Sequence, residues 1–276
     1  MNIFVIKADG SRQSFDREKV VRTCIRMGAS REIAEEIAEE IEMKIYEGIE
    51  TSKILQMIFR LLSKYKREVK HIICLRRSLS LLNPKPDFER FIQILLSEHG
   101  YEVTPNKILR GKCVEHEVDA IARKNDITYF IEVKHHYNYH SYTGLDESRI
   151  ARAILEDVTE GYQLGLNDSR IDKAMIICNT KFSDHAKRYA ECRGISQIGW
   201  NSPPYRSLQT LIEEKKLYPI TCLKGIRTTT KEKLASAGII LLKQLTEISP
   251  EELMKTGISK KTLDSMIKKA RTLIKV

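Results

Sequence analysis

The first part of the chain alternates between apolar and polar residues and then changes to a helical spacing. Residues 2–15 form a pattern of two short strands joined by an Asp-Gly turn. After Asp16, a preferred N-cap residue, apolar residues recur every three or four positions. The same spacing begins again near Ser30 and near Thr51. This pattern predicts a small β-ribbon followed by a helical bundle.

The middle of the chain mixes helical and strand patterns. Residues 88–96 carry one apolar helical face, and a strand begins at Tyr101. Two β-rich runs follow, residues 113–122 and 127–134, on either side of a polar turn at 124–126. Such runs around so short a turn are typical of a β-hairpin.

Prolines divide the chain of 276 residues, which is long enough for two or three domains. Pro84 and Pro86 interrupt a helical pattern, and Pro203, Pro204 and Pro219 mark a second break. The last part has helical patterns only. We therefore expect domains over residues 1–83, 84–217 and 218–276.

The net charge of +10 is unevenly distributed. Residues 1–83 hold 16 basic and 12 acidic side chains (+4), and residues 84–219 hold 19 and 20 (−1). Residues 220–276 hold 12 and 5 (+7). This excess favours a module that binds a polyanion, and the alternative is a lysine-rich solvated tail.

Six cysteines stand alone without a C-x-x-C pair, which argues against a zinc ribbon or a disulfide scaffold. No apolar run reaches the ~18 residues of a membrane span, and the start lacks a signal-peptide pattern. We expect a cytoplasmic protein without a membrane partner.

The predicted hairpin places two acids and a lysine together. Glu132 and Lys134 project from the same face of their strand, because they are two residues apart. Reflection across the turn sets Asp119 opposite residue 131 or 132. Two carboxylates this close need a cation between them, and Mg²⁺ or Mn²⁺ is well suited. The alternative is a solvent-side salt bridge.

Residues 117–120 and 131–136 resemble the PD-(D/E)xK nucleases, most closely the Mrr-like branch. The similarity continues through residues 174–190 and covers nearly all of residues 87–205. It implies a restriction-endonuclease-like α/β core with a mixed central sheet. A retained fold with an inactive site is the alternative.

The nuclease resemblance also implies roles for individual residues. Asp119, Glu132 and the main-chain carbonyl of Val133 would bind the metal, and Glu89 would supply another acid. Lys134 would be the catalytic lysine. A further candidate is Gln163, in a helical segment where the branch often keeps a glutamine.

Three histidines, His135, His136 and His140, follow the hairpin. The second and third have the spacing of a zinc pair on a helix, but their segment has no helical apolar face. We favour contacts with DNA over a metal site.

Residues 1–83 resemble the ATP-cone, a regulatory nucleotide-binding module. The segments that carry the resemblance are residues 5–10, 15–20, 50–54 and the basic pair at 76–77. The family usually has a basic residue where Ala8 stands. The resemblance implies that ATP or dATP binds between ribbon and helices, unless the module serves only for protein contacts. The residues implied are Lys7 and Lys19 at the phosphates, with Gln13, Asp16 and Thr51.

Two Gly-Ile turns, at Gly225 and Gly257, each precede a lysine-bearing helix. The pattern resembles paired helix-hairpin-helix modules, which hold DNA phosphates at helix N-termini without reading sequence. Arg227 stands where a second glycine is common. A module for dimer or protein contacts is the alternative.

Together, the patterns and resemblances predict a multidomain α+β and α/β protein acting on DNA. The function expected is a metal-dependent endonuclease of the Mrr-like, type IV restriction kind, regulated by ATP or dATP and acting as a homodimer. The alternatives are a non-cleaving DNA-binding or regulatory protein on the same fold and a Holliday-junction-type resolvase. Lysine, isoleucine and glutamate richness favours an archaeal or thermophilic source.

Overall fold

The computed structural model describes residues 3–65 and 74–274. Its contacts divide the chain into two compact units, each built from more than one segment. The first comprises Met1–Ile73, Leu223–Thr230 and Ile248–Val276, and the second comprises Cys74–Cys222 and Lys231–Glu247.

The N-terminal segment folds as a three-stranded sheet and three helices. The sheet has the order β2-β1-β3, with β1 (Phe4–Ile6) antiparallel to β2 (Arg12–Ser14) and parallel to β3 (Ile49–Glu50). The helices are α1 (Arg17–Arg26), α2 (Arg31–Glu42) and α3 (Thr51–Tyr65). Asp16 caps α1, as the sequence predicts, and Ser30 caps α2, whose start the sequence places near that residue. Strand β3 was not expected, and α3 begins at Thr51 itself.

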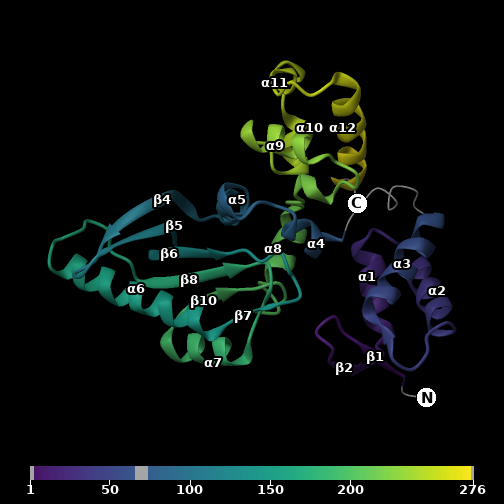
Figure 1. Ribbon diagram of the computed structural model, residues 1–276, viewed down its shortest axis with the longest axis horizontal. Helices are drawn as coiled ribbons and strands as arrows, with labels where there is room; N and C mark the ends of the chain where they lie inside the picture. Colours follow the sequence, from purple (N-terminus) through teal and green to yellow (C-terminus); the bar gives the residue numbers. More distant parts are fainter. Residues whose placement is uncertain (1–2, 66–73, 275–276) are drawn as a thin grey trace. The chain divides into compact units, whose positions relative to one another are not determined.

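A five-stranded mixed sheet forms the centre of the second unit (Figure 1). Its strands are β10 (Ser196–Ile198), β8 (Lys173–Cys178), β6 (Ile127–Lys134), β5 (Glu115–Lys124) and β4 (Glu102–Arg110), in that order. The pairs β4–β5 and β5–β6 are antiparallel, and β6–β8 and β8–β10 are parallel. A separate parallel pair joins β7 (Tyr142–Thr143) and β9 (Lys181–Phe182). The mixed central sheet confirms the expected fold class.

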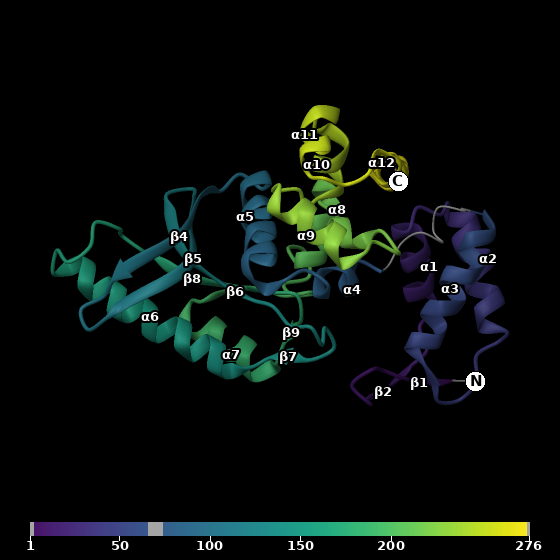
Figure 2. The same ribbon diagram turned by 45° about the horizontal axis from the view of Figure 1, so that its top comes forward.

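Helices cover both faces of this sheet, and Figures 1 and 2 show α5 and α6 on opposite sides of it. One face packs against α6 (Leu145–Gln163) and α7 (Asp184–Arg193), whose apolar residues share a core with Phe130 and Ile176. The other face packs against α5 (Glu89–Glu98) and α8 (Leu208–Lys215). Strands buried on both faces explain the apolar run of β8.

The β5–β6 hairpin has the short turn that the sequence predicts. Asn125 and Asp126 have φ values of 50° and 59°, as in the two-residue turns that match strand twist. Pairing runs from Lys124 with Ile127 to Ala120 with Ile131. Extending this register by one residue sets Asp119 opposite Glu132, one of the two partners that the sequence predicts.

Residues before the proline break also belong to the second unit. Leu79 at the end of α4 (Leu75–Ser80) and Leu82 lie in the core that contains Phe88 of the π-helical segment η2 (Pro84–Phe88). The Thr221 hydroxyl donates to the Ser78 carbonyl at 2.8 Å. Helix α4 therefore packs with the central sheet's domain, although the sequence placed it at the end of the preceding one.

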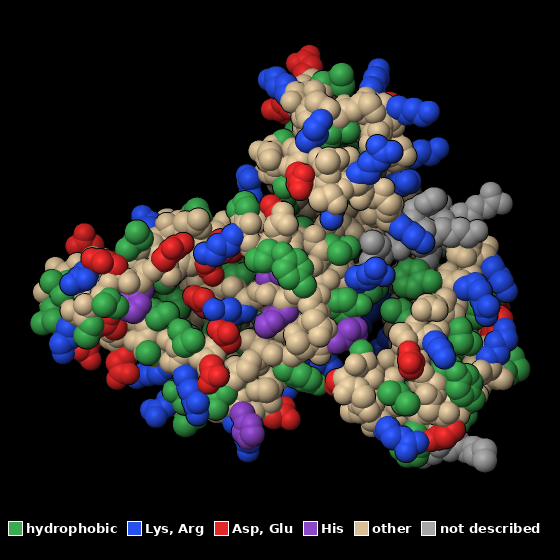
Figure 3. Space-filling model, viewed as in Figure 1, with side chains coloured by type: hydrophobic (Ala, Val, Ile, Leu, Met, Phe, Trp, Pro, Cys, Tyr) green, Lys and Arg blue, Asp and Glu red, His purple; other side chains and the backbone are tan. Residues whose placement is uncertain are grey.

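Only helices follow the short 3-10 turn η3 (Ile220–Cys222) in the described part of the C-terminal segment. They are α9 (Thr228–Ser236), α10 (Leu242–Glu247), α11 (Pro250–Lys255) and α12 (Lys260–Ile274). Gly225 and Gly257 have positive φ (83° and 66°) before α9 and α12, which explains glycine at these turns. In the view of Figure 3, lysine and arginine side chains crowd the surface of α12, whereas α11 carries one lysine and two glutamates.

No helix among residues 3–65 and 74–274 combines the length and apolarity needed to cross a bilayer.

Candidate active site

Asp119 lies near two further acids, one on α5 and one on β6. Asp119 lies on β5, Glu132 on β6, and Glu89 is the first residue of α5. Asp119 Oδ2 accepts a hydrogen bond of 2.7 Å from the backbone N–H of Val133, which fixes its carboxylate beside β6. Glu89 and Asp119 are both buried, with 6% and 8% of their surface exposed.

Burial and crowding of these acids change their proton affinity. Burial, with a further contribution from the charge of Asp119, raises the pKa of Glu89 to about 6. Burial also raises the pKa of Glu132, against the opposing effect of the Lys134 ammonium. A cation between neighbouring buried acids would favour their charged forms.

An ammonium group stands among the acids. Lys85 Nζ lies 3.1 Å from Glu89 Oε1 and 3.5 Å from both Glu117 Oε1 and Asp119 Oδ1. Its hydrogen bond to Glu89 raises the pKa of Lys85, so it is charged at neutral pH. Three carboxylates thus converge on one cation.

Lys134 is held between two other acids. Its Nζ lies 3.0 Å from Glu132 Oε1 and 2.9 Å from Glu147 Oε2, at the start of α6. Burial alone would lower the pKa of Lys134, but its contacts with Glu147 and Glu132 outweigh burial and raise it. Lys134 therefore remains an ammonium at neutral pH and is not available as a base.

The donor set fits a hard divalent cation in its chemistry. Glu89, Asp119 and Glu132 offer carboxylate oxygens, the ligands that Mg²⁺ and Mn²⁺ prefer, and Lys85 shows that a cation is accommodated there. Within the described residues, however, no three His, Cys, Asp or Glu side chains are already gathered closely enough to hold a metal ion. Lys85 contacts Glu89 and Asp119, and Lys134 contacts Glu132.

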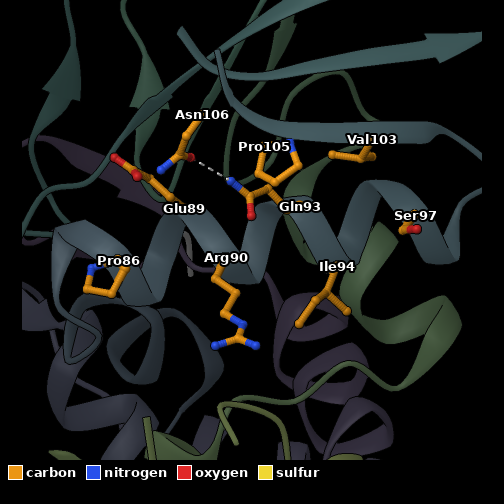
Figure 4. Close-up of a pocket in the computed structure, with 9 residues that line it drawn as sticks. All are labelled: Pro86, Glu89, Arg90, Gln93, Ile94, Ser97, Val103, Pro105 and Asn106. Atoms are coloured by element: carbon orange, nitrogen blue, oxygen red, sulfur yellow. Dashed lines mark hydrogen bonds between the residues drawn. The ribbon is translucent and has the colours of Figure 1, made fainter. Parts of the chain in front are cut away.

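A groove runs beside the acids between α5 and β4, with a volume of ≈ 560 Å³. Figure 4 shows Gln93 reaching from α5 toward Asn106 on β4, with Glu89 at the same side and Arg90 pointing the other way. The Gln93 amide donates to Asn106 Oδ1 at 3.4 Å and to the Asp119 carbonyl at 3.0 Å. Gln93 therefore helps to fix the backbone that carries Asp119.

The loop after Lys134 is attached to α4. His135 Nε2 donates to the Leu79 carbonyl at 3.1 Å. The Arg76 guanidinium lies 5.7 Å from the centre of the Tyr139 ring and 5.8 Å from that of Trp200, within the range of cation–π contacts.

The histidines of this loop are not assembled as a zinc pair. His136 Nε2 lies 3.2 Å from the Thr143 hydroxyl, and its backbone N–H donates to Asn179 at 2.9 Å. Figure 3 shows histidine, acidic and basic side chains gathered on one face around this region.

Gln163 lies outside the cluster. It is the last residue of α6 and is exposed, whereas Glu147 at the first turn of the same helix contacts Lys134. Sixteen residues of α-helix separate them, about 24 Å along its axis. We therefore leave Gln163 out of the proposed site.

The residues expected to bind nucleotide lie around the ends of the small sheet. Lys7 follows β1 and Thr51 follows β3, one step beyond the pair Ile6–Glu50, so both lie at the same end of these parallel strands. Gln13 is in β2, and Asp16 and Lys19 are at the start of α1.

The carboxylate of Asp16 caps the N-terminus of α1. It accepts from the Lys19 backbone N–H and lies 3.7 Å from Lys19 Nζ. Asp16 is thus a helix cap, whatever else it contacts.

Three family models match successive parts of the chain. Residues 3–78 match the ATP cone domain, residues 82–198 match a restriction endonuclease domain, and residues 218–274 match the AF1548-like C-terminal domain. This is the fused architecture that the sequence predicts for the first two domains. The C-terminal match names a different family from the helix-hairpin-helix resemblance.

Two relatives come from Archaeoglobus fulgidus, and both are named as uncharacterized proteins. One is 37% identical over 180 residues, which is 65% of this chain and 98% of the relative. The chain belongs to the AF1548-like family. The second relative is 55% identical over 38 residues, 14% of this chain and 81% of the relative.

The solved structure of a family member supports the fold. A crystal structure described as a protein of unknown function, AF1548, is 36% identical with a TM-score of 0.58. The match covers 67% of this chain and 96% of that one.

Sequence reasoning missed three charged residues of the cluster: Lys85, Glu117 and Glu147. Glu117 had a usable signal, because it lies two residues before Asp119 on the same strand. Lys85 had one too, since it precedes Glu89 by four residues, the spacing of a helical ion pair. No sequence pattern near Glu147 or Lys134 indicated their contact.

Proposed function

We propose that the chain is a divalent-metal-dependent DNA endonuclease whose active site is formed by Glu89, Asp119, Glu132 and Lys134. The observation that supports this most is that the buried acids Asp119 of β5 and Glu89 of α5 lie near the half-buried Glu132 of β6, which contacts a charged lysine. The restriction endonuclease match over residues 82–198 supports the same class of reaction.

The residues divide the work of phosphodiester hydrolysis by charge. Asp119, Glu132 and the Val133 carbonyl would hold the metal, with Glu89 as a further acid. A Mg²⁺ or Mn²⁺ ion held there would polarise the phosphate and make a bound water more acidic. The Lys134 ammonium stabilises the negative charge that grows on the attacked phosphate, since it stays protonated between its two acids.

The flanking domains would regulate and hold the DNA. The ATP cone match supports binding of ATP or dATP at Lys7, Lys19 and Thr51, with Gln13 and Asp16 nearby. The basic C-terminal segment supports contact with DNA phosphates. Nucleotide binding that changes a monomer–dimer equilibrium would bring two nuclease sites together for a double-strand cut.

Plasmid cleavage by the full chain tests this function. We expect cutting with Mg²⁺ or Mn²⁺, none in excess EDTA, and a response to added ATP or dATP. Asp119→Asn and Lys134→Met should each lower the rate by about 10²-fold or more, as losses of charge-stabilising groups do.

The matched control is Asp126→Asn, because Asp126 lies in the hairpin turn and forms a surface ion pair with Arg123. Equal cutting by Asp119→Asn and the control would refute the proposed site. A panel of linear, methylated and branched DNA separates a restriction-type enzyme from a junction resolvase.

A non-cleaving DNA-binding protein is the second candidate. The observation that favours it is the occupation of the acid cluster by Lys85. Tight DNA binding without cutting at any metal concentration would establish it.

A further inference from the structure

Lys85 enters the acid cluster from outside the elements that build the sheet. It lies in η2, just before α5, and its backbone is extended (φ −120°, ψ 135°) rather than helical. Its side chain is 62% exposed, whereas those of its partners Glu89 and Asp119 are 8% and 10% exposed. A mostly solvated lysine thus inserts only its charged end between two buried acids.

This contact differs from an ordinary surface ion pair. Surface pairs join two exposed side chains and contribute little to stability. Here one ammonium meets three carboxylates, two of them buried, which would otherwise repel one another. The exposed stem leaves Lys85 free to swing into water, because little packing has to be broken.

We propose that Lys85 is a built-in counterion that occupies the acid cluster in the metal-free protein and must leave when a divalent cation binds. This inference rests on the proposed function, because it needs a metal held by Asp119 and Glu132 with Glu89 as a further acid. Lys85 is a positioning residue: it keeps the acids preformed and sets the metal concentration at which the site becomes loaded.

Competition follows from charge. The ammonium and a divalent ion would share the oxygens of Glu89 and Asp119, so the two cations cannot both lie there without strong repulsion. Removing the ammonium should therefore strengthen metal binding. Because Lys85 can move into water, its repulsion of the metal is weak. We therefore expect the metal affinity to rise by only about tenfold when the ammonium is removed.

Calorimetric titration of the full chain with Mn²⁺, without DNA or nucleotide, measures this directly. Lys85→Met should bind about tenfold more tightly than the wild type. Lys85→Arg keeps the cation and should stay near the wild-type affinity. Lys112→Met is the matched control. Lys112 is similarly exposed, and its Nζ lies 2.8 Å from Glu160 Oε2, outside the acid cluster.

Thermal unfolding gives a second measurement. In EDTA, Lys85→Met should melt below the wild type, because it leaves buried carboxylates uncompensated, and Mn²⁺ should raise its melting temperature by more than that of the wild type.

The outcomes separate this inference from the proposed function. Equal Mn²⁺ affinity in Lys85→Met and the wild type, with binding lost in Asp119→Ala, would overturn the role of Lys85 and leave the metal site standing. Absence of Mn²⁺ binding in the wild type and in Lys85→Met would overturn both.

Discussion

Replacing Glu89 by Gln should change how the stability of the second unit depends on pH. The fold raises the pKa of Glu89 from 4.5 to about 6, through burial and the nearby charge of Asp119. That difference corresponds to about 2 kcal/mol of unfolding free energy. Solvent screens this effect little, because only 8% of the Glu89 side chain is exposed.

The sign follows from proton uptake. Between pH 4.5 and about 6 the native state holds a proton that the unfolded state has already released. The stability contributed by Glu89 is therefore complete below pH 4.5 and is lost as the pH rises through about 6. Glutamine does not titrate. Between pH 4.5 and pH 7.5, the free energy of unfolding of Glu89→Gln should therefore fall by about 2 kcal/mol less than that of the wild type.

Urea unfolding of the full chain in EDTA measures this difference. Trp200, the single tryptophan, packs against the core of the second unit and reports its unfolding. The control Glu117→Gln removes an acid that meets the same lysine but is 68% exposed, and it should follow the wild-type curve. Parallel pH curves for Glu89→Gln and the wild type would refute the reasoning.

Three further changes test other parts of the structure. Arg76→Ala removes the cation–π contacts with Tyr139 and Trp200, so it should lower the stability of the second unit by roughly 1–2 kcal/mol and alter Trp200 fluorescence in urea unfolding. Arg77→Ala, at an exposed side chain, should do neither. Lys7→Ala should weaken ATP binding about tenfold in calorimetry, and no heat with the wild type would contradict a nucleotide site. Gly161→Ala should cost about 2 kcal/mol in the same unfolding assay, because its Cβ would lie 2.5 Å from a backbone carbonyl; an unchanged midpoint would contradict this.

Local patterns were enough to predict the hairpin and its two acids. The β-rich runs predicted the strands, and counting from the polar turn placed Asp119 opposite residue 131 or 132; the observed register, extended by one residue, gives Glu132. The N-cap Asp16 was predicted for the same reason, since a cap acts within three residues of itself.

Contacts that join distant segments were not readable in this way. Glu147 reaches Lys134 because α6 packs across the sheet, and helical periodicity does not say which strand end a helix start will meet. The proline break at Pro84 is a local signal, whereas the burial of Leu79 depends on packing against residues far along the chain. Strand β3 has two residues and exists through its parallel pairing with β1, which no short pattern encodes.

Crystals of the full chain soaked in Mn²⁺ would test the central claim most directly, through the anomalous scattering of the metal. We predict a peak between the carboxylates of Asp119 and Glu132, beside the carbonyl of Val133, with the Lys85 side chain moved out of the cluster. A saturating soak that gives no peak at these carboxylates, with Lys85 still in contact with Glu89 and Asp119, would contradict the account.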